Sequence, residues 1–436
     1  TRINSDIHVD RHNDGSMGYS LTCYDYPEPI VSHYLSLRYQ SPFGLKLTCA
    51  YTYFGENRAV DRMDATGNVV TAWANKQRGN RIVVQADNSH KVNSMELNYG
   101  VGYRHVSDHS RQLFFQSAYD GFDSRLNENI VDGYVGIQGK FPFGMSISAS
   151  AKMECYMLGD VQRWNFIPQL GISYTRSPRN MLQLNFTSYR SYPSFWELRD
   201  GVSMINGYAE SIGNPKLTPY TNYSMQLSYI FKRAYVATLY NSYIPKYSLQ
   251  LPYQLPDELR LVYQTRNMDY MNVVGLNLHI PFNIGKIINS ALSVNPYYYA
   301  IKCSDFYGIP FSRRLMVCSS SLNVSVKPTA TSPIAISLEG AYVTPSMQGL
   351  YDISSAWRVN AGLKWVFGGR NADVNLMCRD IFSTWRPTTT VNHGGQMLTM
   401  RTLNRSFSIN LAFTWRFNGF RPRSTDIDTA RFGTGK

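Results

Sequence analysis

The chain has 436 residues, including 32 Tyr, 21 Phe and 7 Trp, yet its mean hydropathy is only -0.30. No run of about 18 apolar residues occurs, which excludes a transmembrane helix. The formal net charge is +13, but the basic residues are scattered and form no stripe, so we expect no nucleic-acid partner.

Apolar and polar residues alternate with period two in four segments, which are residues 94–104, 169–175, 355–367 and 404–417. Successive side chains of a strand point to opposite faces, so each segment has one apolar face and one face of small, polar or charged residues. In the last segment the apolar face consists of Phe407, Ile409, Leu411, Phe413, Trp415 and Phe417. This pattern is typical of a membrane barrel with lipid outside and a water-filled lumen. Closed barrels satisfy every backbone group in lipid.

Connections of two lengths alternate along the chain. Short segments rich in Pro, Gly or Asn predict tight turns near residues 41–44, 142–144, 177–180, 232–233, 283–286 and 368–370. Longer polar segments lie near residues 56–78, 107–127, 191–219, 245–260, 302–312 and 381–403. Tight periplasmic turns and long external loops are the layout of outer-membrane barrels.

This alternation predicts an all-β fold, an antiparallel up-and-down transmembrane β-barrel with about 19 strands. The strands are expected near residues 2–10, 17–25, 31–40, 45–55, 79–87, 93–106, 128–140, 145–157, 163–175, 180–190, 220–232, 234–244, 261–281, 287–301, 313–326, 333–345, 355–366, 371–380 and 404–417. The odd number makes the first strand run inward, so we expect the sequence to begin inside a larger barrel. Residues 1–417 would form an N-terminally incomplete barrel, and residues 418–436 a flexible periplasmic C-terminal tail.

A more specific motif lies between Tyr189 and Pro219. Its two parts read Tyr192-Pro193-Ser194-Phe195-Trp196-Glu197-Leu198 and Gly213-Asn214-Pro215-Lys216-Leu217-Thr218-Pro219. The pair resembles the barrel signature of TonB-dependent outer-membrane receptors, in which an aromatic and proline segment precedes a GNP-x-L-x-P turn. Phe166-Ile167-Pro168 and residues 374–382 are similar to further landmarks. Over essentially its whole length the chain resembles the Bacteroidetes-type outer-membrane β-barrel family.

The resemblance implies a 22-stranded barrel in the bacterial outer membrane, occluded by an N-terminal plug. Since no plug-like segment or TonB box precedes the barrel in this sequence, TonB is expected as a partner only through the missing plug. Outer-membrane lipid, lipopolysaccharide and an unknown imported ligand are the other expected partners. A surface lipoprotein is a further candidate, and no cofactor is expected.

Candidate ligand-binding residues are the aromatic residues of the same segment, Tyr192, Phe195, Trp196 and Tyr208. Their rings could bind a hydrophobic or sugar-like ligand, although burial against neighbouring loops is the more common reason for such a cluster. The family-motif residues are Pro193, Gly213, Asn214, Pro215, Leu217 and Pro219. They are expected to hold a fixed turn, because Gly and Pro restrict its backbone and Asn can bond to its own backbone.

Six cysteines, Cys23, Cys49, Cys155, Cys303, Cys318 and Cys378, lack metal-binding spacing. Cys303 and Cys318 flank one predicted loop and are the pair that could form a disulfide; alternatively, Cys318 and Cys378 are small lipid-facing residues. His105 and His109 lie four apart, but on extended backbone this spacing does not converge on a metal. The sequence contains no nucleophile or phosphate-loop motif that indicates catalysis.

The sequence therefore predicts a non-enzymatic membrane protein. The first interpretation is the barrel of a receptor that imports a scarce ligand, such as an iron chelate, a cobalamin or an oligosaccharide, and is TonB-dependent when joined to its plug. The alternative is a plugless passive pore, or a surface adhesin or other structural outer-membrane protein.

Overall fold

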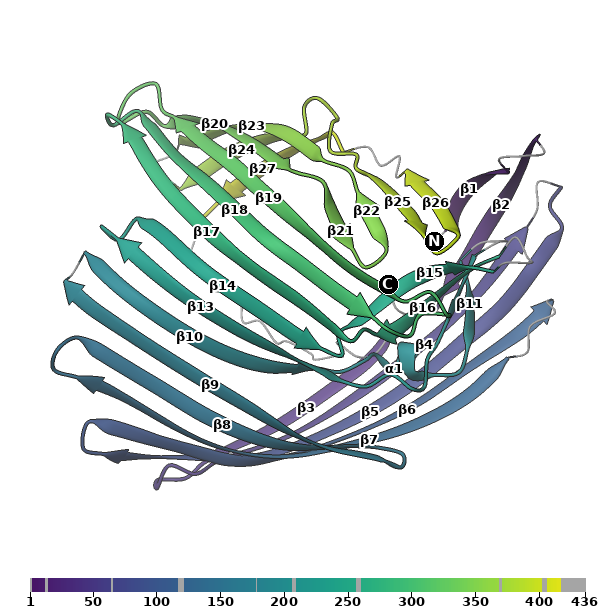
Figure 1. Ribbon diagram of the computed structural model, residues 1–436, viewed down its shortest axis with the longest axis horizontal. Coiled ribbons are helices and arrows are strands. Elements are labelled where there is room, and N and C mark those ends of the chain that lie inside the picture. The colour runs from purple at the N-terminus through teal and green to yellow at the C-terminus, as the bar shows by residue number, and fades with distance from the viewer. Residues whose placement is uncertain are drawn as a thin grey trace.

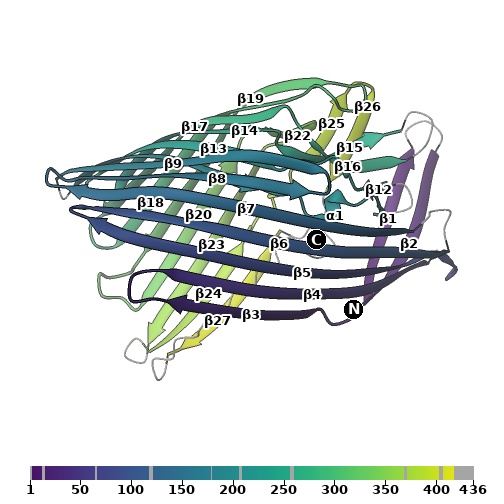
Figure 2. The ribbon, with the colours of Figure 1, turned by 90° about the horizontal axis from the view of Figure 1, so that it is seen from below.

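The fold is dominated by one antiparallel sheet of 19 strands. It is seen in a computed structural model that describes residues 2–11, 15–63, 66–116, 121–177, 179–205, 209–255, 260–367, 371–401 and 406–416. The sheet curves into a trough around a lumen (Figures 1 and 2). The predicted all-β, antiparallel up-and-down fold is confirmed, but the sheet is not closed, since the described parts of its end strands β3 and β27 do not pair with each other.

Seventeen of the strands form a wall in which each strand pairs with the next. They are β3 (Val31–Gln40), β4 (Lys46–Met63), β5 (Val69–Val92), β6 (Met95–Gln116), β7 (Phe122–Phe141), β8 (Met145–Leu158), β9 (Val161–Ser177), β10 (Asn180–Ser191), β13 (Tyr220–Phe231), β14 (Tyr235–Pro245), β17 (Tyr270–Ile284), β18 (Ile288–Cys303), β19 (Phe311–Val326), β20 (Ile334–Val343), β23 (Ala356–Phe367), β24 (Ala372–Arg379) and β27 (Ser408–Trp415).

The other two strands, β1 (Arg2–Arg11) and β2 (Gly15–Pro27), form a hairpin that does not continue the wall. The ladder between β3 and β4 ends at Val31 and Gly55, whereas β4 runs on to Met63. β2 pairs with this free edge, residues 58–63, instead of with β3. Residues 2–10 and 17–25 are therefore strands, as predicted, but the prediction that they are the first two strands of the wall is wrong. The closed 22-stranded barrel stays a prediction, and the predicted tail 418–436 lies outside the described residues.

Side-chain exposure separates a lipid face from a lumen face. Phe407, Ile409, Leu411, Phe413 and Trp415 of the last segment are between 42% and 70% exposed, but the residues between them are exposed too, because β27 ends the sheet; Phe417 lies outside the described residues. Exposed aromatic residues form two bands across the wall. The inner band, near the tight turns, includes Tyr39, Phe43, Phe143, Tyr174, Tyr229, Phe231, Tyr235, Phe282, Trp365 and Trp415. The outer band includes Tyr103, Trp164, Phe166, Tyr243, Tyr298, Tyr342 and Trp357.

Aliphatic residues such as Leu239, Leu338 and Leu363 are exposed between the two bands. Aromatic girdles around an apolar band mark the two interfaces of a membrane-spanning barrel. The bands therefore define the membrane-spanning part of each strand, and everything beyond the outer band faces the exterior.

The connections follow the predicted alternation at the inner end but not at the outer end. Tight inner turns use residues with positive φ, such as Gly44 at 88° and Gly144 at 79°. The predicted loops 56–78 and 107–127 are mostly strand, because the ladders of β4 with β5 and of β6 with β7 continue far beyond the outer band. These extensions lie outside lipid, so neither face needs to be apolar throughout, and they lack the alternation that identifies a membrane strand.

The remaining outer connections fold into two small sheets. One, the first cap sheet, contains β11 (Val202–Met204), β12 (Ala209–Ile212), β16 (Leu261–Asn267) and β15 (Ser248–Gln254). The other, the second cap sheet, contains β21 (Ser346–Gln348), β22 (Tyr351–Ile353), β25 (Thr388–His393) and β26 (Gln396–Arg401). The predicted strand 261–281 is therefore divided between β16 and β17.

A buried apolar cluster holds the two cap sheets to the wall, and includes Leu251, Met268, Ile301, Phe306 and Leu350. Gln254 and Gln396 join the two cap sheets directly through a pair of hydrogen bonds. The helix α1 (Phe195–Leu198) is short, and none of the described segments is a helix long and apolar enough to cross a membrane.

Candidate functional site: the lumen and its outer mouth

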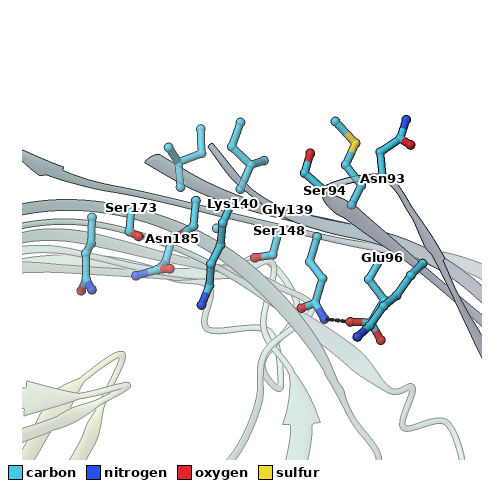
Figure 3. Close-up of a pocket in the computed structure, with 16 residues that line it drawn as sticks. Asn93, Ser94, Glu96, Gly139, Lys140, Ser148, Ser173 and Asn185 are labelled. Atoms are coloured by element: carbon cyan, nitrogen blue, oxygen red, sulfur yellow. Dashed lines mark hydrogen bonds between the residues drawn. The ribbon is translucent and has the colours of Figure 1, made fainter. Parts of the chain in front are cut away.

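A polar surface, which we call the lumen patch, covers the lumen face of β6 to β10 near the inner end. Two adjoining cavities of about 720 and 450 Å³ lie over it and share Gln138, Ser148, Gly171 and Asn185. Figure 3 shows Glu96, Lys140 and Asn185 projecting from the sheet on the same side. This surface follows from the alternation, which places amide, hydroxyl and charged side chains on the face opposite the exposed apolar residues.

The side chains of the lumen patch can form hydrogen bonds with a ligand. The Gln138 amide donates to Glu96 over 2.9 Å, and the hydroxyls of Ser146 and Ser173 lie 2.7 Å apart. A Cβ added at Gly171 would lie 2.7 Å from the Ser148 hydroxyl oxygen, so the glycine keeps the wall flat there. Amides and hydroxyls both donate and accept, so the patch suits a polar surface or a hydrated ligand.

Beyond the lumen patch, a cluster of four charged residues crosses from β7 to β10. The Lys152 ammonium lies 3.4 Å from Asp132 and 3.6 Å from Glu154. The Arg190 guanidinium lies 3.5 Å from the other oxygen of Glu154, whose side chain is only 1% exposed. Because the charges balance, the cluster fits a role in holding the wall together.

The segment from Ser191 to Pro219 enters the lumen at its outer mouth instead of extending away from it. Ser194 caps α1, since its hydroxyl accepts from the Glu197 amide and the Glu197 carboxylate accepts from the Ser194 amide. Phe195, Leu198 and Leu217 are buried together against Val106 of β6. The loop that connects β10 to β13 therefore packs on β6, which is adjacent to neither strand.

The predicted ligand-binding aromatics are partly occupied by these contacts. Tyr192 stacks on Tyr156 with ring centres 5.6 Å apart, and burial raises the pKa of its phenol. Phe195 is fully buried, so in this conformation it offers no surface to a ligand. Trp196 lies against the guanidinium of Arg199 and is half-buried. Tyr208 lies outside the described residues, and a ligand-binding role for the four aromatics stays a prediction.

The family-motif turn is held by backbone contacts. The Gly213 amide donates to the Gly201 carbonyl over 3.0 Å, and a Cβ at Gly213 would lie 1.8 Å from the Arg199 carbonyl oxygen. The Asn214 side chain donates to the Thr265 carbonyl over 2.9 Å and accepts from the Lys216 amide. Among the other motif residues, Pro193, Leu217 and Pro219 are buried and Pro215 is exposed. The turn thereby ties α1 to β16 of the first cap sheet.

Sequence reasoning missed the buried charges of this mouth. Arg199 is 3% exposed and lies over the rings of Phe122 and Trp196. Burial lowers its pKa to about 9 against the opposing effect of Asp108 and Glu56. Burial also raises the pKa of Asp108, whose carboxylate accepts hydrogen bonds from Gln77 and Ser110. No local pattern marks these residues, because the contacts join segments far apart in the sequence.

Among the described residues, the cysteines and histidines form no metal site or disulfide. Cys303 pairs with Phe311 and Cys318 with Pro296, seven positions apart on one ladder, which is about 23 Å. Both thiols are free, so the proposed disulfide is wrong. His105 contacts Asn129 and His109 contacts Asp123. Throughout the described ranges there is no group of three or more His, Cys, Asp or Glu side chains that could hold a metal.

These features define a β-barrel protein of the bacterial outer membrane. Residues 44–415 match the outer membrane protein beta-barrel family, and the chain belongs to that family. The predicted family resemblance is thereby confirmed. No curated protein matches the chain in sequence.

Solved structures of receptors and transporters share the fold. The siderophore receptor PirA from Pseudomonas aeruginosa matches with a TM-score of 0.55 and 10% identity, over 91% of this chain and 74% of that one. The ferric yersiniabactin uptake receptor FyuA from Yersinia pestis matches with 0.57 and 11%, over 93% and 63%. The copper transporter OprC matches with 0.61 and 9%, over 94% and 73%. The chain spans between 57% and 75% of the length of such structures.

Proposed function

We propose that this protein is the barrel of an outer-membrane importer, which takes a ligand from the exterior into the lumen and depends on TonB when joined to a plug. The observation that carries the proposal is the lumen patch, a continuous polar surface inside an apolar wall. Such a surface can hold the polar exterior of a plug domain or guide a hydrated ligand along the wall. The likeness to TonB-dependent receptors supports the fold on which this rests.

The shape of the outer mouth favours a receptor over the alternative of an open passive pore. The segment 191–219 and both cap sheets reach over the lumen and are fixed by a buried apolar cluster. A receptor needs a rigid surface facing its ligand, and loops that are fixed in place over the lumen supply one.

Metal chelates are the ligand class to test first. Two of the matching structures are named as a siderophore receptor and a ferric yersiniabactin uptake receptor, and a third is a copper transporter. The described part of the chain contains no group of three or more His, Cys, Asp or Glu residues that could hold a bare metal ion. We therefore favour a chelate, recognised through the organic shell around its metal, over a free ion.

The test is uptake of radioactive iron, supplied as a panel of ferric siderophores, by cells that make the native protein but lack other iron receptors. Uptake should stop when a protonophore removes the energy source. A variant with Ser148→Arg and Ser173→Arg on the lumen patch should lose most of this uptake, because two long charged side chains cover the patch.

A matched control places the same change on the opposite wall, at Ser321→Arg and Ser325→Arg of β19. These residues alternate with the lipid-facing Leu322 and so face the lumen away from the patch. The control should retain uptake. Entry that continues unchanged in the presence of the protonophore would instead identify a passive pore, and equal uptake by both variants would remove the lumen patch from the transport path.

A further inference from the structure

The wall has a break between β9 and β10 at its outer half. Their ladder begins at the inner turn and ends where Phe186 pairs with Leu170. β9 continues to pair with β8 as far as Val161, and β10 continues to pair with β13 as far as Ser191. Figure 1 shows the two strands diverging beyond this point.

A proline lies at the break. Pro168 is two residues beyond Leu170, the last paired residue of β9, and has no backbone N–H to donate to β10. The Ser188 carbonyl on β10 instead receives a long hydrogen bond, 3.4 Å, from the side chain of Gln169. The Ser188 hydroxyl in turn donates to the Pro168 carbonyl over 2.5 Å. Side chains thus replace the ladder for one step, after which the two strands separate.

A cavity of about 420 Å³, which we call the wall site, occupies this break. Its basic residues are Arg163 from β9, Arg190 from β10 and Lys246, which follows β14. Among the described residues that line it, none is acidic. Trp164 and Asn165 line it as well, and because neighbouring residues of a strand point to opposite faces, the wall site reaches from the lumen face to the lipid face.

The Arg190 side chain and the backbone of Lys246 are held in place before any ligand arrives. The Arg190 side chain is 7% exposed, and it donates to the Thr221 hydroxyl over 3.0 Å. Its Nε has no hydrogen-bond partner, although Glu154 lies 3.5 Å away. The backbone of Lys246 has a positive φ of 55° and is fixed from both sides, by the Asp269 carbonyl and the Asn267 side chain.

The level of the wall site in the membrane indicates which anion it meets. Trp164 is 66% exposed and belongs to the outer aromatic band, as does the neighbouring Tyr243. Aromatic residues of this band mark the level of the lipid headgroups. A positively charged cavity that opens there meets the phosphates of the outer leaflet before any other anion. Arg is well suited to phosphate, since its guanidinium offers several donors in a fixed plane.

We propose that the wall site binds a phosphate monoester on the headgroup of a phosphorylated glycolipid of the outer leaflet. Arg163 and Lys246 supply the charge that meets the phosphate, while Trp164 packs against the sugar or the acyl chains. Arg190, whose charge Glu154 balances, shapes the inner end of the site. The site is separate from the lumen patch, so it does not rest on the proposed import function.

The experiment measures binding of a bisphosphorylated glucosamine-disaccharide lipid to the detergent-solubilised native protein by native mass spectrometry. The double variant Arg163→Gln and Lys246→Gln should bind it at least about tenfold more weakly, since hydrogen bonds to a charged group are stronger than those between neutral groups and two of them are lost. Arg190 is left unchanged because it pairs with Glu154 inside the wall. The matched control is Lys232→Gln with Lys286→Gln. It removes two cations from inner turns, at the other end of the strands from the wall site, and should bind like the parent.

Two further ligands separate the sources of the phosphate. The dephosphorylated lipid should bind the parent as weakly as the phosphorylated lipid binds the double variant. Inorganic phosphate at equal concentration should not displace the lipid. The proposal is overturned if the double variant binds like the parent, if the dephosphorylated lipid binds equally well, or if inorganic phosphate displaces the lipid. Heat-modified gel migration confirms that each variant is folded.

Discussion

Replacing one lipid-facing leucine by arginine tests the assignment of the two faces. Leu239 lies on β14, four residues from Tyr235 of the inner band and four from Tyr243 of the outer band. Its side chain is 54% exposed and lies beside Leu227 and Leu276 on the adjoining strands. It therefore occupies the middle of the apolar band.

Leu239→Arg should destabilise the folded protein by about 2 to 4 kcal/mol, the cost of an arginine at the bilayer midplane on the lipid face. The preceding residue provides the matched control. Thr238 faces the lumen, where its hydroxyl lies 2.8 Å from that of Ser228. Thr238→Arg should cost only about 1 kcal/mol, because it loses one hydrogen bond while the new guanidinium reaches water.

The assay is urea unfolding of both variants in lipid vesicles, followed by heat-modified gel migration. The expected difference between the two variants, about 1 to 3 kcal/mol, changes the folding equilibrium by roughly 5- to 150-fold. Equal destabilisation by the two changes, or a larger effect of Thr238→Arg, would refute the assignment of the faces.

Three further predictions concern the outer half. Gly213→Ala should release the segment from Ser191 to Pro219, because the new Cβ would meet the Arg199 carbonyl oxygen. Limited proteolysis should then cut this segment, while heat-modified migration of the barrel stays unchanged. Cys303 and Cys318 should both react with an alkylating agent in denaturant without reductant, and a mass two hydrogens below that of the reduced chain would contradict the register. Pro168→Ala should restore a backbone donor and slow hydrogen exchange at the outer end of β10, whereas unchanged exchange would show that the proline does not cause the break.

The membrane-spanning part of the fold was predictable from the sequence because lipid imposes a strict rule on it. In β23 and β27, each outward side chain meets hydrocarbon and each inward one meets water, so the alternation is uninterrupted. Beyond the outer band the rule no longer applies. The extensions of β4 and β5 are therefore strands without alternation, and their sequence pattern predicts a loop.

The outer mouth could not be predicted, because its contacts join segments that are distant in the sequence. β12 pairs in parallel with β16, which belongs to a different loop, and short strands of this kind carry no recognisable pattern. Likewise, the guanidinium of Arg199, from the segment between β10 and β13, lies over the ring of Phe122 on β7. Only the motif turn at Gly213 and Asn214 was evident, since Gly and Asn mark unusual backbone wherever they occur together.

One residue connects the wall site to the arrangement of the mouth. Pro168 belongs to the motif Phe166-Ile167-Pro168, and a proline inside a central strand removes one bond of the ladder. Beyond Phe186, β10 keeps a backbone ladder only with β13, and its last residues lead directly into Tyr192 and α1. A β10 paired to its full length would keep its end in the wall and start the next loop outside the lumen. With this end free of the β9 ladder, Phe195 and Leu198 contact Val106, and the wall site lined by Arg163, Arg190 and Lys246 occupies the break.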